Sequence, residues 1–381
     1  MRQESIFTNA RIVTADKVIE GTLRTKDGVI VEIAEGASRS SEAIDLEGDY
    51  LIPGLIELHT DNLEKHFVPR PGVRWPALAA VTAHDAQVAA AGITTVYDAV
   101  TVGQTAAGGD RMSFLRDMVD TIAAAQKREV LRITHRLHLR CEVSYENCPG
   151  LFETFLDHSL LDMASLMDHT PGQRQFTSLE SYRNYYQKKY AWSDEEFSRF
   201  AVKQKAAHET HAGPNRRKIV AMAKERGLTL ASHDDATLAH VDEAISEGMA
   251  IAEFPTTFEA AEASHKAGMQ VLMGAPNVVR GKSHSGNLSS RDLAERRMLD
   301  IISSDYMPVS LVHAAFLLGE SGAGFTLPEG IAMASKTPAR AVGIKDRGEI
   351  AVGQRADLAQ VRKVDDLPLV RQVWRDAVRV I

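Results

Sequence analysis

The chain has 381 residues, a formal net charge of −7 and a pI near 6.1, so it has material for one large core but no net cationic field for nucleic acid or anionic lipid. No basic leader precedes an apolar run, and no stretch nears the ~20 apolar residues of a membrane span. The two cysteines, seven residues apart, fit neither a redox pair nor a zinc knuckle. We expect a soluble cytoplasmic protein that binds neither nucleic acid nor membrane.

The two ends of the chain share one sequence pattern. The first fifty residues alternate short β-type runs with turn residues, which predicts strands of a small sheet. Similar runs return after residue 345, in GEIAVGQRADLAQV and LVRQVWRDAVRVI. We therefore expect residues 1–50 and 345–381 to form one composite β-sandwich annex.

Residues 51–344 alternate apolar runs with helical stretches such as PALAAVTAHDAQVAAAG, the pattern of βα units around a parallel sheet. Eight runs read as strands: LIPGLIELHTD, TTVYDAV, LRITHRLHLRCEV, DMASLMDH, LTLASHDD, MAIAEFP, QVLMGAP and LDIISSDY. Eight is the strand number of a TIM-like barrel. The sequence thus predicts an α/β fold, a (β/α)8 barrel with a β annex built from both termini.

One segment, residues 170–214, interrupts the βα rhythm and is rich in aromatic side chains. They are Tyr182, Tyr185, Tyr186, Tyr190, Trp192, Phe197 and Phe200. Long excursions on the loop face of a barrel are often lids. A packed helical hairpin without substrate contact is the alternative, and the sequence leaves both open.

Ionisable side chains gather where the predicted strands end. His59 and Asp61 share one face of the first strand with Glu57, because residues two apart point the same way. A His-x-Asp pair is weak support for a metal when it stands alone. The third strand repeats the alternation with His138, Arg140 and Glu142 on one face, and burying such groups unpaired is costly.

Later runs end in further groups that bind cations or move protons: Asp168, His169, His233, Asp234, Asp235, Glu253, Ser304 and Asp305. The chemistry of such barrels concentrates at the carboxyl ends of the strands. Imidazole and carboxylate together suit Zn, Mn, Fe or Mg, so we predict a centre of one or two divalent ions. A catalytic centre lowers the pKa of a bound water, and Asp305 is the candidate base that takes its proton.

Six other histidines carry weaker predictions. His158, His208, His211 and His265 lie among polar neighbours and are expected to be solvated. His84 stands in an otherwise apolar helix and is expected to be a buried hydrogen-bond partner. His66 lies on a loop, where a substrate contact stays open.

Residues 274–287, GAPNVVRGKSHSGN, combine three glycines with Arg280, Lys282 and His284. Glycine lets backbone N–H groups approach an anion, and barrels often hold phosphate on the loops after strands seven and eight. A solvated basic loop is the alternative. Other strand-end or loop residues that we expect to bind substrate are Arg70, Arg74, His169 and Arg174. This much positive charge in an acidic chain predicts a substrate with several phosphates.

At this point LIPGLIELHTD, the acid of the eighth strand and KDRGEIAVGQRADL resemble the amidohydrolase superfamily. Within it, segments between residues 55 and 308 resemble the branch that acts in phosphonate metabolism: ELHTDN, RPGVRWPA, HRLHLRCE, MDHTPGQRQF, ASHDDAT, AEFPTTFEAA, LMGAPNVVRG, SHSGN and SSDYMP. That resemblance implies hydrolysis of a small phosphorylated ribosyl phosphonate, α-D-ribose 1-methylphosphonate 5-triphosphate, to the 5-phosphate and diphosphate in the carbon–phosphorus lyase pathway.

The resemblance also implies metal ligands. It carries them to His59, Asp61, Glu142, His233 and Asp305, with an acid at 61 where the superfamily usually has a second histidine. The histidine of the sixth strand is absent, and Glu253 stands near its place.

Two other functions remain open at this stage. A C–N hydrolase, a deacetylase or deaminase of a phosphorylated small molecule, would keep the metal residues but would not need several cationic loops. A non-catalytic barrel would be expected to lack ligands, whereas His59, Asp61, His233 and Asp305 are present. The sequence leaves open whether the chain forms a homo-oligomer.

Overall fold

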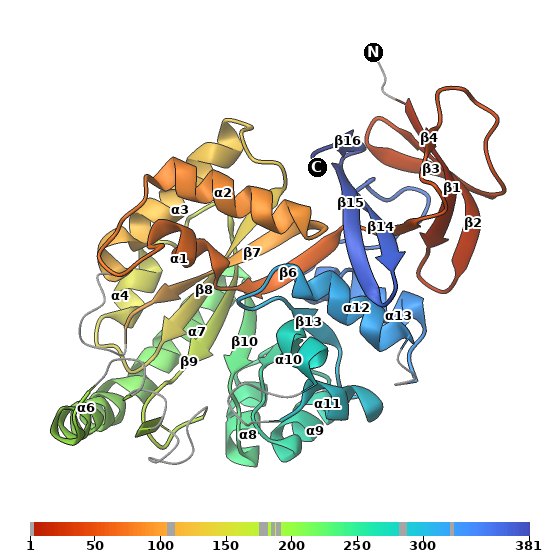
Figure 1. Cartoon of the computed structure of the whole chain (residues 1–381). Coiled ribbons are helices and arrows are strands. Elements are labelled where there is room, and N and C mark those ends of the chain that lie inside the picture. The colour runs from red at the N-terminus through yellow and green to blue at the C-terminus, as the bar shows by residue number, and fades with distance from the viewer. Residues whose placement is uncertain are drawn as a thin grey trace. The chain divides into compact units, whose positions relative to one another are not determined.

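The structure is a computed structural model that describes residues 4–104, 111–174, 182–183, 187, 192–281, 288–320 and 324–381. Strands from both ends of the chain form one sheet: β1 (Glu4–Val13), β2 (Val18–Lys26), β3 (Val29–Glu35), β4 (Ile44–Asp45), β5 (Tyr50–Pro53), β14 (Leu358–Val364), β15 (Leu367–Arg375) and β16 (Val378–Arg379). Their order is β16-β15-β14-β5-β1-β2-β3, with β4 beside β1. Figure 1 shows the red and blue strands side by side, with both termini at this sheet.

The sheet from the two ends has its own apolar core. Phe7 and Trp374 meet edge to face with ring centroids 5.0 Å apart, and Leu23, Leu51 and Leu358 are fully buried in the same cluster. Phe7 and Trp374, 367 positions apart in the sequence, therefore pack together. This confirms the predicted annex of both termini.

A second sheet contains the eight strands expected between the ends: β6 (Leu55–Thr60), β7 (Ile93–Val102), β8 (Thr134–Glu142), β9 (Leu161–Met167), β10 (Thr229–His233), β11 (Ile251–Glu253), β12 (Gln270–Gly274) and β13 (Ile301–Ser303). Neighbouring strands in this sheet are also consecutive in the sequence, from β6 to β13. A parallel bridge between Thr60 and Asp305 joins the first strand to the segment after the last. The predicted (β/α)8 barrel is confirmed.

Helices alternate with these strands (Figure 1). In the described part of the chain they are α1 (Asn62–Phe67), α2 (Ala77–Ala90), α3 (Arg111–Lys127), α4 (Cys148–Glu153), α6 (Asp194–Ala207), the π-helix η1 (His208–Ala212), α7 (Gly213–Arg226), α8 (Leu238–Ser246), α9 (Phe258–Lys266), α10 (Ala275–Arg280), α11 (Ser290–Glu295), α12 (Ser310–Glu320), α13 (Leu327–Ala332) and α14 (Lys336–Ala341). Threonine caps begin three of them: the side chains of Thr237, Thr257 and Thr326 accept hydrogen bonds from the first turns of α8, α9 and α13. None of the described helices is long and apolar enough to cross a membrane.

By its contacts the chain divides into two compact units. The first consists of Met1–Asp98, Asp120–Arg136 and Met273–Ile381, and the second of Ala99–Val119 and Leu137–Leu272. The candidate metal residues accordingly fall into two groups, His59, Asp61 and Asp305 in the first unit and Glu142, His233 and Glu253 in the second. The domain boundaries expected near residues 50 and 345 stay a prediction.

The described aromatic residues of the 170–214 segment form a cluster of their own. Trp192 packs on Phe200 with ring centroids 4.8 Å apart, and Tyr182 stacks on Phe200 at 6.3 Å. Phe197 is buried with them. Helix α6 begins at a capping box formed by Ser193 and the glutamate three residues later. These contacts fit a packed hairpin, and movement as a lid stays a prediction; Tyr185, Tyr186 and Tyr190 lie outside the described residues.

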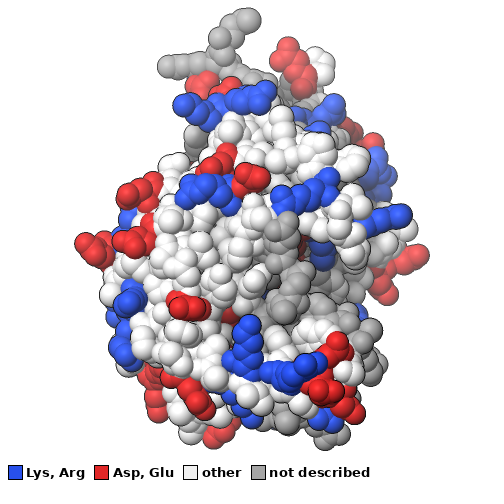
Figure 2. All heavy atoms as spheres, turned by 90° about the vertical axis from the view of Figure 1, so that its left-hand side faces the viewer, with Lys and Arg blue, Asp and Glu red and all other residues white. Residues whose placement is uncertain are grey.

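Charged side chains of both signs lie on the face shown in Figure 2. Lys and Arg side chains stand among Asp and Glu side chains, with uncharged surface between them. Interspersed charges create no extended field of one sign. This agrees with the mixed charge of the sequence.

Candidate metal centre

In the first unit, the main chain brings His59, Asp61 and Asp305 together. The N–H of Asp305 donates to the carbonyl oxygen of His59 over 3.1 Å, and the N–H of Asp61 donates to the carbonyl oxygen of Asp305 over 3.1 Å. The Thr60 hydroxyl donates to that same carbonyl over 2.9 Å. His59 Nε2 lies 3.9 Å from Asp61 Oδ1. An imidazole and two carboxylate residues thus meet where the first and last barrel strands end.

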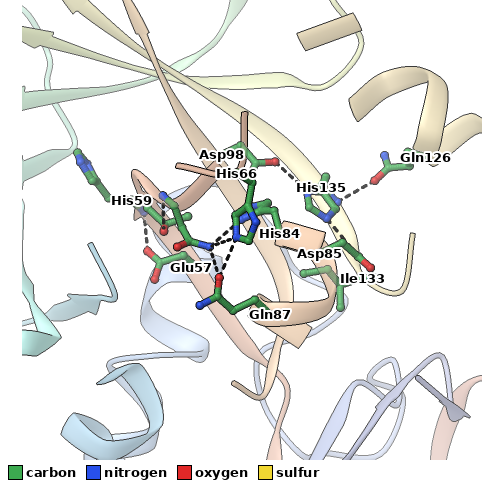
Figure 3. Close-up of polar contacts among 12 residues, drawn as sticks. Glu57, His59, His66, His84, Asp85, Gln87, Asp98, Gln126, Ile133 and His135 are labelled. Atoms are coloured by element: carbon green, nitrogen blue, oxygen red, sulfur yellow. Dashed lines mark hydrogen bonds and ion pairs between the residues drawn. The ribbon is translucent and has the colours of Figure 1, made fainter. Parts of the chain in front are cut away.

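Glu57 fixes both sides of this junction from inside. Its Oε1 accepts the backbone N–H of His59 over 2.6 Å, and its Oε2 accepts that of Ser304 over 2.5 Å. Figure 3 shows Glu57 directed at His59. Burial raises the pKa of Glu57 to about 7, although the hydrogen bonds from Ser304 and His59 act in the opposite direction. The sequence placed Glu57 on the same face as His59 but gave no sign that it links two strands.

Behind the His-x-Asp turn lies a buried network of imidazoles and carboxylates (Figure 3). Asp98 on β7 accepts from His84 Nε2 and from His135 Nδ1, each over 2.7 Å. His135 Nε2 lies 3.4 Å from Asp85 on α2. Burial alone lowers the pKa of His135, but Asp98 and Asp85 outweigh it and raise that pKa to about 9. Asn62, next to Asp61, contacts His84 Nδ1 over 3.0 Å, so the network reaches the turn.

The network also bears on the predicted roles of histidines. His84 is fully buried and hydrogen-bonded, as expected. His66 contacts the Gln87 side chain over 2.9 Å, and its contact with substrate stays a prediction. His84, Asp98 and His135 have the atom spacing of a possible metal site. We interpret them as a proton-sharing cluster because three of the four imidazole nitrogens lie at hydrogen-bond distance from a carboxylate and the fourth, His84 Nδ1, lies at that distance from the Asn62 amide.

In the second unit, two imidazoles stand between three carboxylates. His169 Nδ1 lies 2.7 Å from Glu142 Oε2, and His233 Nδ1 lies 3.1 Å from Glu253 Oε2. Asp234 Oδ2 lies 3.4 Å from His233 Nε2 and 4.0 Å from His169 Nε2. Glu142, His233, Asp234 and Glu253 are all buried. The structure therefore gathers the second group of candidates, with Asp234 as an added member.

Residues just after three strands adopt the same unusual backbone conformation. Asp234 directly follows β10 with φ 56°, Phe254 directly follows β11 with φ 54°, and Asp305, two residues past the end of β13, has φ 53°. Positive φ in a non-glycine residue costs free energy and concentrates at functional sites. Two of these three residues, Asp234 and Asp305, are acids of the candidate centre.

Comparison with known proteins supports the predicted superfamily. No family model matches the chain. Alpha-D-ribose 1-methylphosphonate 5-triphosphate diphosphatase of Escherichia coli (strain K12) is 50% identical over 376 residues, which cover 98% of this chain and 100% of the relative. This chain belongs to that diphosphatase family. The match spans both ends of the chain as well as every strand that carries a candidate site residue.

Solved structures with the same fold are more distant in sequence. N-acetylglucosamine-6-phosphate deacetylase from Pasteurella multocida is 14% identical with a TM-score of 0.67, and covers 99% of each chain. The corresponding deacetylase from Mycobacterium smegmatis is 16% identical with a TM-score of 0.65, covering 99% of this chain and all of its own. The structure of an amidohydrolase is 16% identical with a TM-score of 0.64, and the match covers 99% of this chain and 98% of that one. These likenesses show the amidohydrolase fold alone.

The cationic residues that the sequence predicts to bind substrate differ in how far they are exposed. Arg70, Arg74 and Arg280 are exposed, the last of them at the end of α10. Arg174 is 5% exposed and pairs with Asp235 and Glu243. Its charge is satisfied inside the protein, so we do not assign it to phosphate. Lys282 and His284 lie outside the described residues.

His208 departs from the solvated position expected for it. Its Nδ1 lies 2.6 Å from Asp168 Oδ2, and the hydrogen bond that the imidazole donates to Asp168 raises the pKa of His208. His208 begins the π-helix η1, a wider turn often found at functional sites. The imidazole thereby joins the helical insertion to the end of β9, beside His169. The sequence HETHA contains no pattern that predicts a π-helix.

Proposed function

We propose that this chain hydrolyses α-D-ribose 1-methylphosphonate 5-triphosphate to the 5-phosphate and diphosphate, with one or two divalent cations. The observation that carries the proposal is the 50% identity to a diphosphatase named for that substrate, over the whole of the relative. The group of His169, His233 and Asp234, whose side-chain atoms have metal-ligand spacing, supports it independently.

Each unit holds candidate donors for a cation at its strand ends. In the first unit these are His59, Asp61 and Asp305, which are linked through the main chain. In the second unit they are His233, with Glu142 and Glu253 as the residues that the family resemblance implies. Mixed imidazole and carboxylate donors fit Zn, Mn or Fe, and a carboxylate-rich set admits Mg.

In the proposed reaction, water attacks the α-phosphorus in line and diphosphate leaves. When bound, the cation would lower the pKa of a water and offset charge on phosphoryl oxygens. Asp305, whose main chain is hydrogen-bonded to His59 and Asp61, takes the proton of the attacking water. The exposed guanidinium of Arg280, with Arg70, Arg74, Lys282 and His284, binds the triphosphate oxygens.

The test is an assay that separates the products. The purified protein, loaded with Mn²⁺ or Zn²⁺, is given the ribosyl triphosphate, and diphosphate and orthophosphate are quantified separately. We expect diphosphate in a one-to-one ratio with the 5-phosphate. Orthophosphate alone would mean attack at the terminal phosphorus and would contradict the proposal. N-acetylglucosamine 6-phosphate serves as the comparison substrate, and rapid acetate release from it would favour C–N hydrolysis instead.

Two finer points belong to the same proposal. Both cysteines are buried free thiols, which supports a reducing, cytoplasmic location. A homo-oligomer is compatible with the sequence and is tested by the mass of the protein in solution.

A further inference from the structure

We propose that His169, His233 and Asp234 bind the cation directly, and that Glu142 and Glu253 orient the two imidazoles. The inference rests on the metal dependence proposed above. It reassigns His169, which the sequence placed among the substrate-binding residues. It also assigns Glu142 and Glu253 to contacts with the imidazoles, without direct contact to the cation. All five residues belong to the second unit.

The first step concerns the protons of the two imidazoles. An ionised carboxylate can only accept hydrogen bonds. Glu142 lies 2.7 Å from His169 Nδ1 and Glu253 lies 3.1 Å from His233 Nδ1, so both Nδ1 atoms carry protons. The lone pair available to a cation is then on Nε2 of each ring. A carboxylate behind a histidine in this way is the usual support of a metal-binding imidazole.

The second step is the convergence of the Nε2 atoms. Both approach the same oxygen, Asp234 Oδ2, at 3.4 Å from His233 and 4.0 Å from His169. Ligand atoms bound at about 2.0–2.2 Å in a tetrahedral site lie roughly 3.3–3.6 Å apart. The first separation already matches, and the second needs a shift of roughly half an ångström. The two rings meet edge to face with centroids 6.0 Å apart.

The third step is the state of Asp234. Its side chain is 5% exposed, and among the described residues Oδ2 has no hydrogen-bond partner. A buried carboxylate oxygen without a partner costs free energy, and such oxygens usually bind an ion or water. The positive φ of Asp234 adds a second cost at the same residue. A cation between Oδ2 and the two Nε2 atoms accounts for both.

One contact acts against a cation at this place. Arg140 Nη2 lies 3.4 Å from His233 Nε2, a distance typical of a weak hydrogen bond. The guanidinium can only donate, so this contact agrees with a lone pair on Nε2. Cation binding requires Arg140 to turn away from that nitrogen. The alternative is that the Arg140 guanidinium itself supplies the positive charge that the carboxylates require. In that case the second unit binds no cation, and the test below would show no binding.

The test uses cysteine as a reporter of direct ligation. A thiolate bound to Co²⁺ gives a charge-transfer absorption that a thiol one step away does not give. Full-length His169→Cys and Glu142→Cys proteins are titrated with Co²⁺, and difference spectra are taken against the wild type, which contains Cys141 and Cys148. We expect the band in His169→Cys and not in Glu142→Cys. His265→Cys on α9 is the matched control.

The reverse result, a band in Glu142→Cys and none in His169→Cys, would overturn the assignment. If a cysteine variant fails to fold, Co²⁺ affinity by calorimetry replaces the spectrum. Glu142→Gln should weaken binding about 10- to 100-fold, as is usual for a supporting partner, and Asp234→Ala should weaken it more. Equal losses would contradict the proposal. Asp242→Ala, an exposed acid on α8, should leave affinity unchanged.

The outcome separates this inference from the proposed function. If His169→Cys shows the band but the wild type releases no diphosphate, the ligand assignment stands and the proposed function is wrong. If the wild type releases diphosphate but binds no Co²⁺ at these residues, the proposed function stands and the ligand assignment is wrong.

Discussion

Asp305 and His59 are joined through the main chain, the N–H of Asp305 donating to the carbonyl oxygen of His59 over 3.1 Å. The return bond from the N–H of Asp61 to the carbonyl oxygen of Asp305 completes a bridge between the first strand and the segment after the last. Because this bridge uses no side chain, replacing the carboxylate of Asp305 should leave the backbone arrangement unchanged. The chemistry of that carboxylate can therefore be tested apart from the fold.

Asp305→Asn should abolish most turnover while the cation stays bound or is only modestly weakened. A positioned general base contributes on the order of 10²- to 10⁴-fold to a rate. We expect diphosphate release under substrate saturation to fall by at least about 100-fold, with metal content measured by mass spectrometry near the wild-type value. Asp157→Asn, an exposed acid, is the control. Full activity of Asp305→Asn would refute the proposed base.

Removing the metal should lower both activity and stability. A ligand that binds only the folded protein adds about 2.7 kcal/mol at 100 times its Kd. We expect a chelator to stop diphosphate release and to lower Tm, and added Zn²⁺ or Mn²⁺ to restore both. Calorimetry with and without the chelator measures the second effect. Unchanged activity after verified metal loss would contradict a metal-dependent hydrolase.

Arg280→Ala should weaken triphosphate binding more than it slows the chemical step. The guanidinium is exposed at the end of α10, so its loss leaves no buried group unpaired. We expect KM to rise about tenfold, equivalent to about 1.4 kcal/mol, with kcat within about twofold. Lys282→Ala should act in the same direction. Lys266→Ala on α9 is the control for lost surface charge, and an effect of Arg280→Ala confined to kcat would refute this role.

The network of His135 should make stability depend on pH. The pKa of His135 is about 9 in the folded chain, against about 6.5 when unfolded, because Asp98 and Asp85 outweigh the effect of burial. A raised histidine pKa stabilises fully below pH 6.5, and that contribution is lost as pH rises through 9. At 1.4 kcal/mol per pKa unit, up to about 3 kcal/mol is lost over this window.

Urea unfolding at pH 6.5 and pH 9 measures this loss. His135→Gln should flatten the difference between the two pH values, and Asp98→Asn should do the same by removing the partner. Ser264→Ala, a buried side chain that does not titrate, should keep the wild-type difference. A wild-type pH difference in His135→Gln would show that other groups carry it.

The strands of the barrel could be predicted because each is a short apolar run followed by polar residues, a signal carried by neighbouring positions. The location of His59, Asp61, His233 and Asp305 follows from the same signal, since they stand at the ends of those runs. The motifs also predict the diphosphatase family, and the relative that is 50% identical confirms it.

Contacts between distant strands could not be predicted in this way. Glu142 meets His169 because of how β8 and β9 pair, and their register depends on the whole sheet. The same holds for Glu57, which reaches Ser304 across 247 positions. His208 approaches Asp168 only because one turn of helix is widened, and no local preference of those residues specifies it. Side-chain partners, unlike strand positions, depend on tertiary structure.

The annex also constrains how the protein is made. Strand β5, complete by residue 53, pairs on one side with β1 and on the other with β14, which begins at Leu358. Ribosomes add roughly 5–20 residues per second, so one edge of β5 waits at least about 15 s for its partner during synthesis. An unpaired edge is a site for wrong association. The nascent chain is therefore most exposed to aggregation before its last thirty or so residues emerge, and truncation there should harm solubility more than loss of the same length from a surface loop.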